Sequence, residues 1–142
     1  MAIPNGGGGY QLGAGNGSEV VMGALATPAA NLGAGATLTG AQIASGILLV
    51  GASQTTAQTF TLPSATLLDT AATAVVPNAR IGSTFELVVI NTGTGSGSAA
   101  LSMGSGTGFT DGGNATIALS AQTSGRFLFR KTADATWTVY RV

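Results

Sequence analysis

Few side chains in this sequence could do chemistry. Its 142 residues include five acidic residues, five basic residues, no histidine and no cysteine. Without cysteine there is no disulfide framework, iron–sulfur site or thiolate nucleophile, and without histidine there is no imidazole base. The formal net charge of zero and the isoelectric point near 6.0 argue against non-specific nucleic-acid binding, which requires clustered Lys and Arg. We therefore expect function to arise from the organisation of the chain.

The acidic residues are too widely spaced along the chain to predict a catalytic pair of carboxylates. Hydrolysis by two carboxylates needs them about 5 to 10 Å apart in a cleft, yet only Glu86 falls on an expected strand. Its neighbours are apolar, so we expect a structural ion pair with Arg80, Arg126 or Arg130. Lys131 falls in or beside an expected turn, where solvation would keep its pKa too high for a general base.

Two glycine-rich stretches and one Asp-Gly sequence could form ligand-binding loops. Residues 93–98 and 104–108 lack the lysine of a phosphate-binding loop, and neither begins an expected helix. Residues 111–114, Asp-Gly-Gly-Asn, could offer oxygen ligands to Ca²⁺, but this composition between two strands is more typical of a turn. The sequence therefore predicts no catalytic residue, no cofactor site and no metal site, and we expect that the protein is not an enzyme.

The apolar residues do not form a membrane-spanning segment. Mean hydropathy is +0.40, but no apolar run approaches the roughly 20 residues that a helix needs to cross a bilayer. Residues 1–9 lack the basic and apolar regions of a secretory signal, so we expect synthesis in a cytoplasm. Zero net charge and few charged residues leave little repulsion against self-association, which favours a subunit of an assembly.

Residues 1–36 differ in composition from the rest of the chain. They are rich in Gly and Ala and carry one charge, Glu19. Because glycine raises the entropic cost of ordering each residue, we expect an extended N-terminal arm there. Pure linkers tend to be polar Gly/Ser sequences, so the apolar residues of this arm favour docking onto a partner over a tail with no role. These candidate partner-binding residues are Tyr10, Val20, Val21, Met22 and Leu25.

Residues 37–142 are expected to form one mainly β domain. Short apolar and Thr-rich runs alternate with Gly, Asn, Asp and Ser, at spacings typical of a sandwich or barrel. We expect an antiparallel β-sandwich or jelly-roll-like domain with one short helix at 65–74, capped by Ser64. The expected strands are 37–39, 46–50, 59–62, 84–91, 99–103, 115–119, 125–130 and 136–142.

The strand at 84–91 is expected to be central and covered on both sides. Phe85, Leu87 and Val89 alternate along one face, and the second face carries Val88 and Ile90, so both faces are largely apolar. The strands at 125–130 and 136–142 are expected to form a closing hairpin. The aromatic residues expected in the core are Phe85, Phe127, Phe129 and Trp137.

Five segments, taken in order, carry a resemblance to a known class of protein. They are TLTGAQI at 37–43, FTLPSA at 60–65, GSTFELVVIN at 82–91, GRFLFR at 125–130 and TWTVYRV at 136–142. This order resembles the small β-rich structural proteins of tailed bacteriophages, of the capsid decoration (cement) and head-fibre type. In that class a TLP-x-A-x-x-L segment and a G-x-x-F-x-L/F-x-V-x-N strand recur.

The resemblance implies a β-sandwich or jelly-roll-like subunit, commonly a homotrimer, on the outside of an icosahedral head. Its partner would be the major capsid protein, whose neighbouring subunits it would bridge, and its location would be the virion. The arm at 1–36 would anchor to the shell or thread through the trimer. The alternative is a receptor- or glycan-binding module of a head or tail fibre, with contact loops at 93–98 and 104–114. Phe109 is the one aromatic residue in those loops.

Overall fold

The computed structural model describes residues 31–142, which are mainly β with two short helices. The arm residues Tyr10, Val20, Val21, Met22 and Leu25 lie outside the described residues. In chain order the elements are α3 (Gly40–Ile43), β1 (Ile47–Val50), β2 (Gln58–Thr61), α4 (Thr66–Asp69), β3 (Thr84–Asn91), β4 (Ala99–Ser102), β5 (Phe109–Gly113), β6 (Ser124–Ala133) and β7 (Thr136–Arg141).

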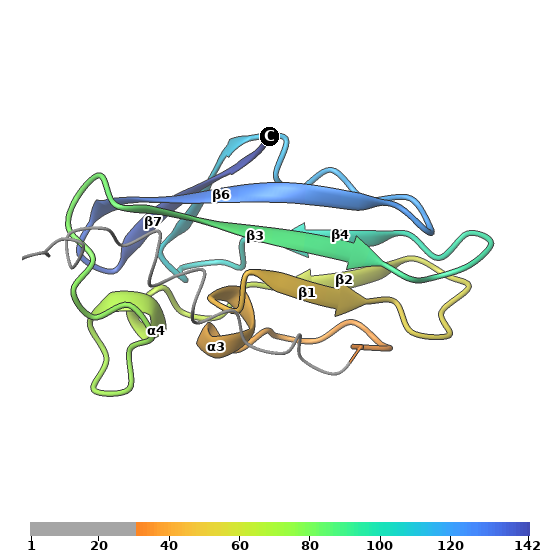
Figure 1. Ribbon diagram of the computed structural model, residues 1–142, viewed down its shortest axis with the longest axis horizontal. Coiled ribbons are helices and arrows are strands. Elements are labelled where there is room, and N and C mark those ends of the chain that lie inside the picture. Colours follow the sequence, from red (N-terminus) through yellow and green to blue (C-terminus); the bar gives the residue numbers. More distant parts are fainter. Residues whose placement is uncertain (1–30) are drawn as a thin grey trace, which may run out of the picture.

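The described strands form two sheets. One has five strands in the order β1-β3-β6-β7-β5, and the other pairs β2 with β4. Figure 1 shows β1, β3 and β6 side by side, with β2 and β4 behind them and both helices along one edge. The buried apolar side chains of the five-stranded sheet and of β2 and β4 belong to one core.

The expectation of an antiparallel sheet is wrong for three of the five strand pairings. β3 with β6 and β6 with β7 are antiparallel, whereas β1 with β3, β2 with β4 and β5 with β7 are parallel. From β1 to β4 the chain alternates between the two sheets. Each strand therefore returns to its own sheet through a crossover rather than a hairpin, which allows parallel pairing.

The short helices differ from the single helix expected at 65–74. α4 covers only Thr66–Asp69, and its N-cap is Ala65 rather than Ser64, with no side-chain capping bond. The expected strand at 37–39 instead leads into α3. Thr39 caps α3, because its hydroxyl accepts from the Gln42 amide at 3.2 Å and the Gln42 side chain accepts from the Thr39 amide at 2.7 Å. This reciprocal capping box was present in the sequence as Thr-x-x-Gln.

Residues 109–119 also differ from expectation. The expected strand at 115–119 is reduced to one bridge between Leu119 and Ala99, while Phe109–Gly113 forms β5 beside β7. Gly112 lies where the register of β5 with β7 shifts, between Asp111 and Gly113, and a Cβ there would overlap the side chains of Tyr140 and Thr138. Glycine in this segment therefore allows neighbouring strands to approach closely, in addition to forming turns.

The expected core aromatic residues are confirmed. Phe127, Phe129 and Trp137 are fully buried, and Phe85 packs against them. The rings of Phe85 and Phe129 stack at 4.8 Å between centroids, and Trp137 meets Phe85 edge-on at 5.5 Å. Such geometries add to the free energy gained from burial.

β3 occupies an inner position between β1 and β6, as expected. Its inward residues Leu87 and Val89 are buried, whereas Val88 and Ile90 on the other side are only half-buried. The described elements therefore cover one face of β3 rather than both. Within residues 31–142, neither helix has the length or apolar character needed to traverse a bilayer.

Candidate functional site

A buried charged cluster lies at one end of the five-stranded sheet. Lys131 continues the inward alternation of β6, opposite Trp137 on β7, and is only 4% exposed. Its Nζ lies 2.7 Å from Asp69 Oδ2 and 2.9 Å from Asp134 Oδ1, and it donates to the Ala79 carbonyl oxygen at 3.1 Å. The expectation of a solvated Lys131 is therefore wrong, because strand register places this side chain inside.

The hydrogen bonds in this cluster hold Lys131 in its charged form. The bond to Asp69, followed by that to Asp134, raises the pKa of Lys131, although burial works in the opposite direction. With its three protons directed at three acceptors, this ammonium has no lone pair for general-base or nucleophilic chemistry. The cluster joins α4 to the β6–β7 turn, since Asp69 Oδ2 also accepts from the Ala135 amide at 3.3 Å.

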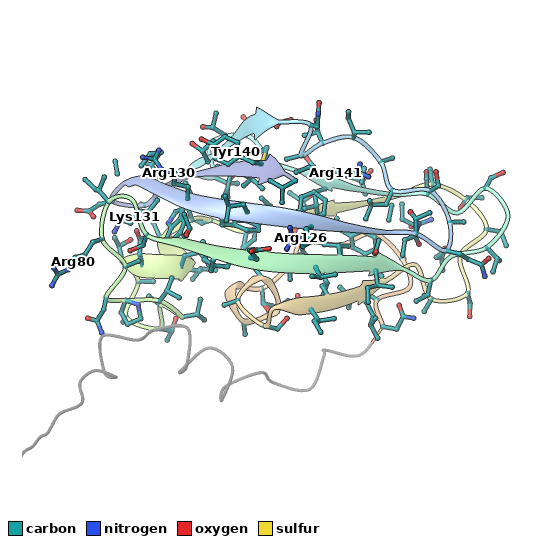
Figure 2. The ribbon with its side chains drawn as sticks, turned by 45° about the horizontal axis from the view of Figure 1, so that its top comes forward. Arg80, Arg126, Arg130, Lys131, Tyr140 and Arg141 are labelled. Atoms are coloured by element: carbon teal, nitrogen blue, oxygen red, sulfur yellow. The ribbon has the colours of Figure 1, made fainter. Side chains whose placement is uncertain are left out.

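A second acid–base pair lies on the sheet surface. Arg126 Nη1 on β6 is 3.2 Å from Glu86 Oε1 on β3, and each side chain is about half exposed. This confirms the expected ion pair of Glu86 and selects Arg126 from the three candidates. Figure 2 shows Arg80 instead pointing away from the protein body, at the end where Lys131 lies. Exposed pairs of this kind contribute little to stability.

Asp111 closes the turn that follows β5. Its Oδ1 accepts from the amides of Gly113 and Ala115 at 2.9 and 3.1 Å, and its Oδ2 accepts from the Thr116 amide and hydroxyl at 3.3 and 2.9 Å. Burial acts to raise the pKa of Asp111, but these hydrogen bonds together outweigh it and lower the pKa. The carboxylate is thus engaged with its own turn. Within residues 31–142, no group of three or more His, Cys, Asp or Glu side chains is placed to hold a metal ion.

Asn91, which the sequence analysis did not single out, ties the first glycine-rich loop to the sheet. It ends β3 and is 1% exposed. Its Nδ2 donates to the carbonyl oxygens of Gly97, Leu119 and Ser120 at 2.8, 3.1 and 3.0 Å, and its Oδ1 accepts from the Gly93 amide at 2.9 Å. The signal in the sequence was an Asn at the end of a buried strand, directly before a Gly-rich loop.

The contact loops of the alternative fibre hypothesis are partly closed. A Cβ at Gly93 or Gly97 would overlap backbone atoms of the same loop or of Gln54, so 93–98 packs against its surroundings. Phe109 is 8% exposed and meets Phe129 edge-on at 6.0 Å. It therefore offers no open ring for stacking on a sugar.

The last residues of the expected arm lie against the β domain. Leu32 donates its amide to the Leu49 carbonyl oxygen at 3.0 Å and accepts from the Gly51 amide at 2.6 Å, beside the edge of β1. Gly35 donates to Gln58 Oε1 at 2.9 Å. The described chain thus begins at the β1 edge of the five-stranded sheet. Three large apolar residues on the described surface are well exposed, namely Ile81, Ile117 and Val142.

Comparison with known proteins identifies no relative. No protein-family model matches the chain, and neither curated proteins nor solved structures give a match.

Proposed function

We propose that this chain is a structural protein of a bacteriophage virion, a capsid decoration protein that binds the outside of the head. The domain at 37–142 would be a β-sandwich or jelly-roll-like unit, assembled as a homotrimer, and its partner would be the major capsid protein. The support from sequence is the ordered set of five segments from 37–43 to 136–142. The support from structure is the two-layer, mainly β arrangement of these segments.

One observation carries this proposal beyond the resemblance. Among the described residues the acidic side chains are engaged in internal contacts: Asp69 and Asp134 with Lys131, Glu86 with Arg126, and Asp111 with its turn. At the same time Ile81, Ile117 and Val142 are 70%, 55% and 63% exposed. Separate exposed apolar residues are ordinary on a protein surface, so the support lies in the scarcity of free charges, which leaves little repulsion against association with other subunits.

The physical role of such a protein is to add contacts across the seams of a shell under pressure from packaged DNA. A small domain gains contact area by laying an extended arm on its neighbour. Ordering the arm costs conformational entropy, which a fixed shell and the avidity of a trimer offset. Small residues suit this role, because the backbone of the arm can approach another backbone closely and pair with it as an added strand.

The test is cosedimentation of the purified protein with emptied heads of the phage that encodes it. We expect the full chain to cosediment and a variant lacking residues 2–30 to remain in the supernatant. Circular dichroism would verify that the variant keeps its β structure. A matched control replaces Gly7 and Gly8 with serine, which keeps the length and the apolar residues of the arm. Absence of binding by the full chain would overturn the proposal.

A further result would separate the role of the arm from that of the domain. If the variant lacking residues 2–30 occupies heads as well as the full chain does, the arm has no part in attachment. Sedimentation of the free protein measures the oligomeric state, for which we expect a trimer. Binding to a glycan array by the full chain, with no binding to heads, would support the fibre module instead.

A further inference from the structure

A tight turn joins the loop after α4 to the start of β3, at the end of the five-stranded sheet where Lys131 lies. The Ser83 amide donates to the Arg80 carbonyl oxygen at 2.8 Å, which closes a β-turn with Ile81 and Gly82 at its two central positions. The φ of Gly82 is 94°, and a type II turn requires a positive φ at this third position. We call residues 80–83 the end turn.

Hydrogen bonds on both sides hold the end turn to the sheet. The Gly82 amide donates to the Lys131 carbonyl oxygen at 2.9 Å, and the Lys131 amide donates to the Ser83 carbonyl oxygen at 2.9 Å. Ser83 Oγ accepts from the Arg80 amide at 2.9 Å. On the preceding side, Lys131 Nζ donates to the Ala79 carbonyl oxygen at 3.1 Å. The buried Lys131 cluster therefore fixes the backbone of a turn that lies on the surface.

The end turn presents an arginine and an isoleucine next to each other at the surface. Arg80 points away from the protein body in Figure 2, and within residues 31–142 it has no ion-pair partner. Ile81 is 70% exposed, more than any other large apolar residue that the structure describes. A single exposed apolar residue is ordinary, but this one adjoins an exposed guanidinium on a backbone that hydrogen bonds hold in place.

The opposite end of the sheet also has an arginine and an exposed isoleucine, but there the two residues are bonded to each other. β7 begins beside Lys131 and ends at Arg141, which donates from Nη1 to the Ile117 carbonyl oxygen at 3.1 Å. The Arg80 guanidinium has no bond of this kind to the residues that the structure describes. It is therefore available to an acceptor outside residues 31–142.

These features together are those of an anchor in a protein interface. Arginine is among the residue types that contribute most to binding between proteins, and it can pair with a carboxylate through two parallel hydrogen bonds. Side chains on a backbone that is already fixed lose less conformational entropy on binding. A convex turn fits a concave site, so the matching surface is a recess with apolar side chains and a carboxylate at its rim.

We propose that the end turn inserts into a recess between neighbouring subunits of the head, with Ile81 in an apolar pocket and Arg80 paired with a carboxylate. This inference rests on the proposed function and names the part of the domain that contacts the major capsid protein. It gives the buried Lys131 cluster a positioning role, because its hydrogen bonds fix the backbone on both sides of Arg80 and Ile81.

Cosedimentation of full-length variants with emptied heads tests this anchor. We expect Arg80→Gln and Ile81→Ser each to weaken head binding on the order of tenfold. The matched controls are Ile117→Ser, at the exposed isoleucine near the opposite end, and Arg130→Gln, at an exposed arginine of β6; both should bind as the full chain does. Binding of Arg80→Gln and Ile81→Ser at the level of the full chain would overturn the anchor and leave the proposed function standing.

A site-specific cross-link identifies the partner directly, because the natural chain has no cysteine. Ile81→Cys labelled with benzophenone maleimide and illuminated on heads should form a product with the summed mass of this chain and the major capsid protein. Ile117→Cys with the same label is the control and should give little of this product. Equal yields from the two positions, or a product from Ile117→Cys alone, would contradict insertion of the end turn. Failure of the unlabelled full chain to bind heads would instead overturn the proposed function, and this inference with it.

Discussion

The two ends of the five-stranded sheet are held by buried polar side chains of different kinds. At one end Lys131 of β6 joins α4 and the β6–β7 turn through two acids, Asp69 and Asp134. At the other end Asn91 of β3 joins the loop at 93–97 to Leu119 and Ser120 through neutral hydrogen bonds. The antiparallel register of β3 and β6 places these two residues at opposite ends of the strands.

The difference lies in how each end depends on its partners. Every partner of Asn91 is a backbone group that substitution cannot remove, and no charge is desolvated. At the charged end, Lys131 forms ion pairs with Asp69, whose side chain is fully buried, and with Asp134, whose side chain is 85% exposed. Burying charges costs free energy that only complete pairing offsets. The neutral end should therefore tolerate changes of pH, and the charged end should not.

The largest expected effect comes from breaking the charged end on one side. Lys131→Met leaves the Asp69 carboxylate buried without its cation, so we expect a greater loss of unfolding free energy than for Asn91→Ala or Glu86→Gln. Adding Asp69→Leu should recover most of the lost unfolding free energy, because the uncompensated buried charge is then removed. Urea denaturation at pH 7 measures both. Arg130→Met, at the adjacent exposed position of β6, is the matched control and should cost little.

The next effect comes from the neutral end. Asn91→Ala removes both halves of the amide and leaves the buried Gly93 amide and Gly97 carbonyl oxygen without their partner, so we expect a loss of about 2 to 4 kcal/mol. Asn91→Asp should not restore stability, because a carboxylate would face the three carbonyl oxygens. Urea denaturation at pH 7 measures the unfolding free energy of both variants. A loss well below 1 kcal/mol would show that water replaces the amide and that this end is held by other contacts.

Alkaline pH should weaken the charged end of the sheet and leave the neutral end unaffected. The pKa of Lys131 is raised in the folded protein above its ordinary value of 10.5. Its contribution to stability is therefore complete below the pKa of the unfolded chain and is lost as pH rises through the higher folded-state pKa. We expect the wild type and Asn91→Ala to lose stability in parallel above about pH 10.5. The double variant Lys131→Met/Asp69→Leu should lose less, as followed by thermal unfolding against pH.

The smallest effect is expected for the exposed pair between the two ends. Glu86→Gln removes the partner of Arg126, and because both groups are about half exposed, we expect a change of under about 1 kcal/mol, further reduced by salt. Thermal unfolding at low and high ionic strength measures it. A loss comparable to that of Lys131→Met would mean that the surface pair and the buried charged cluster contribute alike to stability.

Much of the core was predictable because side chains alternate along a strand whatever its partner. Phe127, Phe129 and Trp137 were expected inside and are buried, and Glu86 was expected to pair with an arginine. The same alternation, continued by one more step along β6, would have placed Lys131 inside. The polar composition of residues 131–134 pointed to a turn instead, and the strand in fact extends through this segment to Ala133.

Other features were not accessible from local pattern. β5 has only Phe109 buried, so its strand conformation depends on hydrogen bonding to β7 and on the space that Gly112 leaves for Tyr140. Asn91 has hydrogen-bond partners up to 29 residues away in the chain. Such long-range contacts have no signature in the spacing of neighbouring residues.

The sequence by itself determined that residues 37–142 are mainly β, which face of the longer strands carries the aromatic core residues, and that reactive side chains are scarce. These properties follow from residue type and from a period of two, both of which are local. Only the tertiary structure decided that three strand pairings are parallel and that the sheet ends are held by Lys131 and Asn91. The reason is physical: alternation specifies a face, whereas strand direction and buried polar partners depend on the path of the chain between layers.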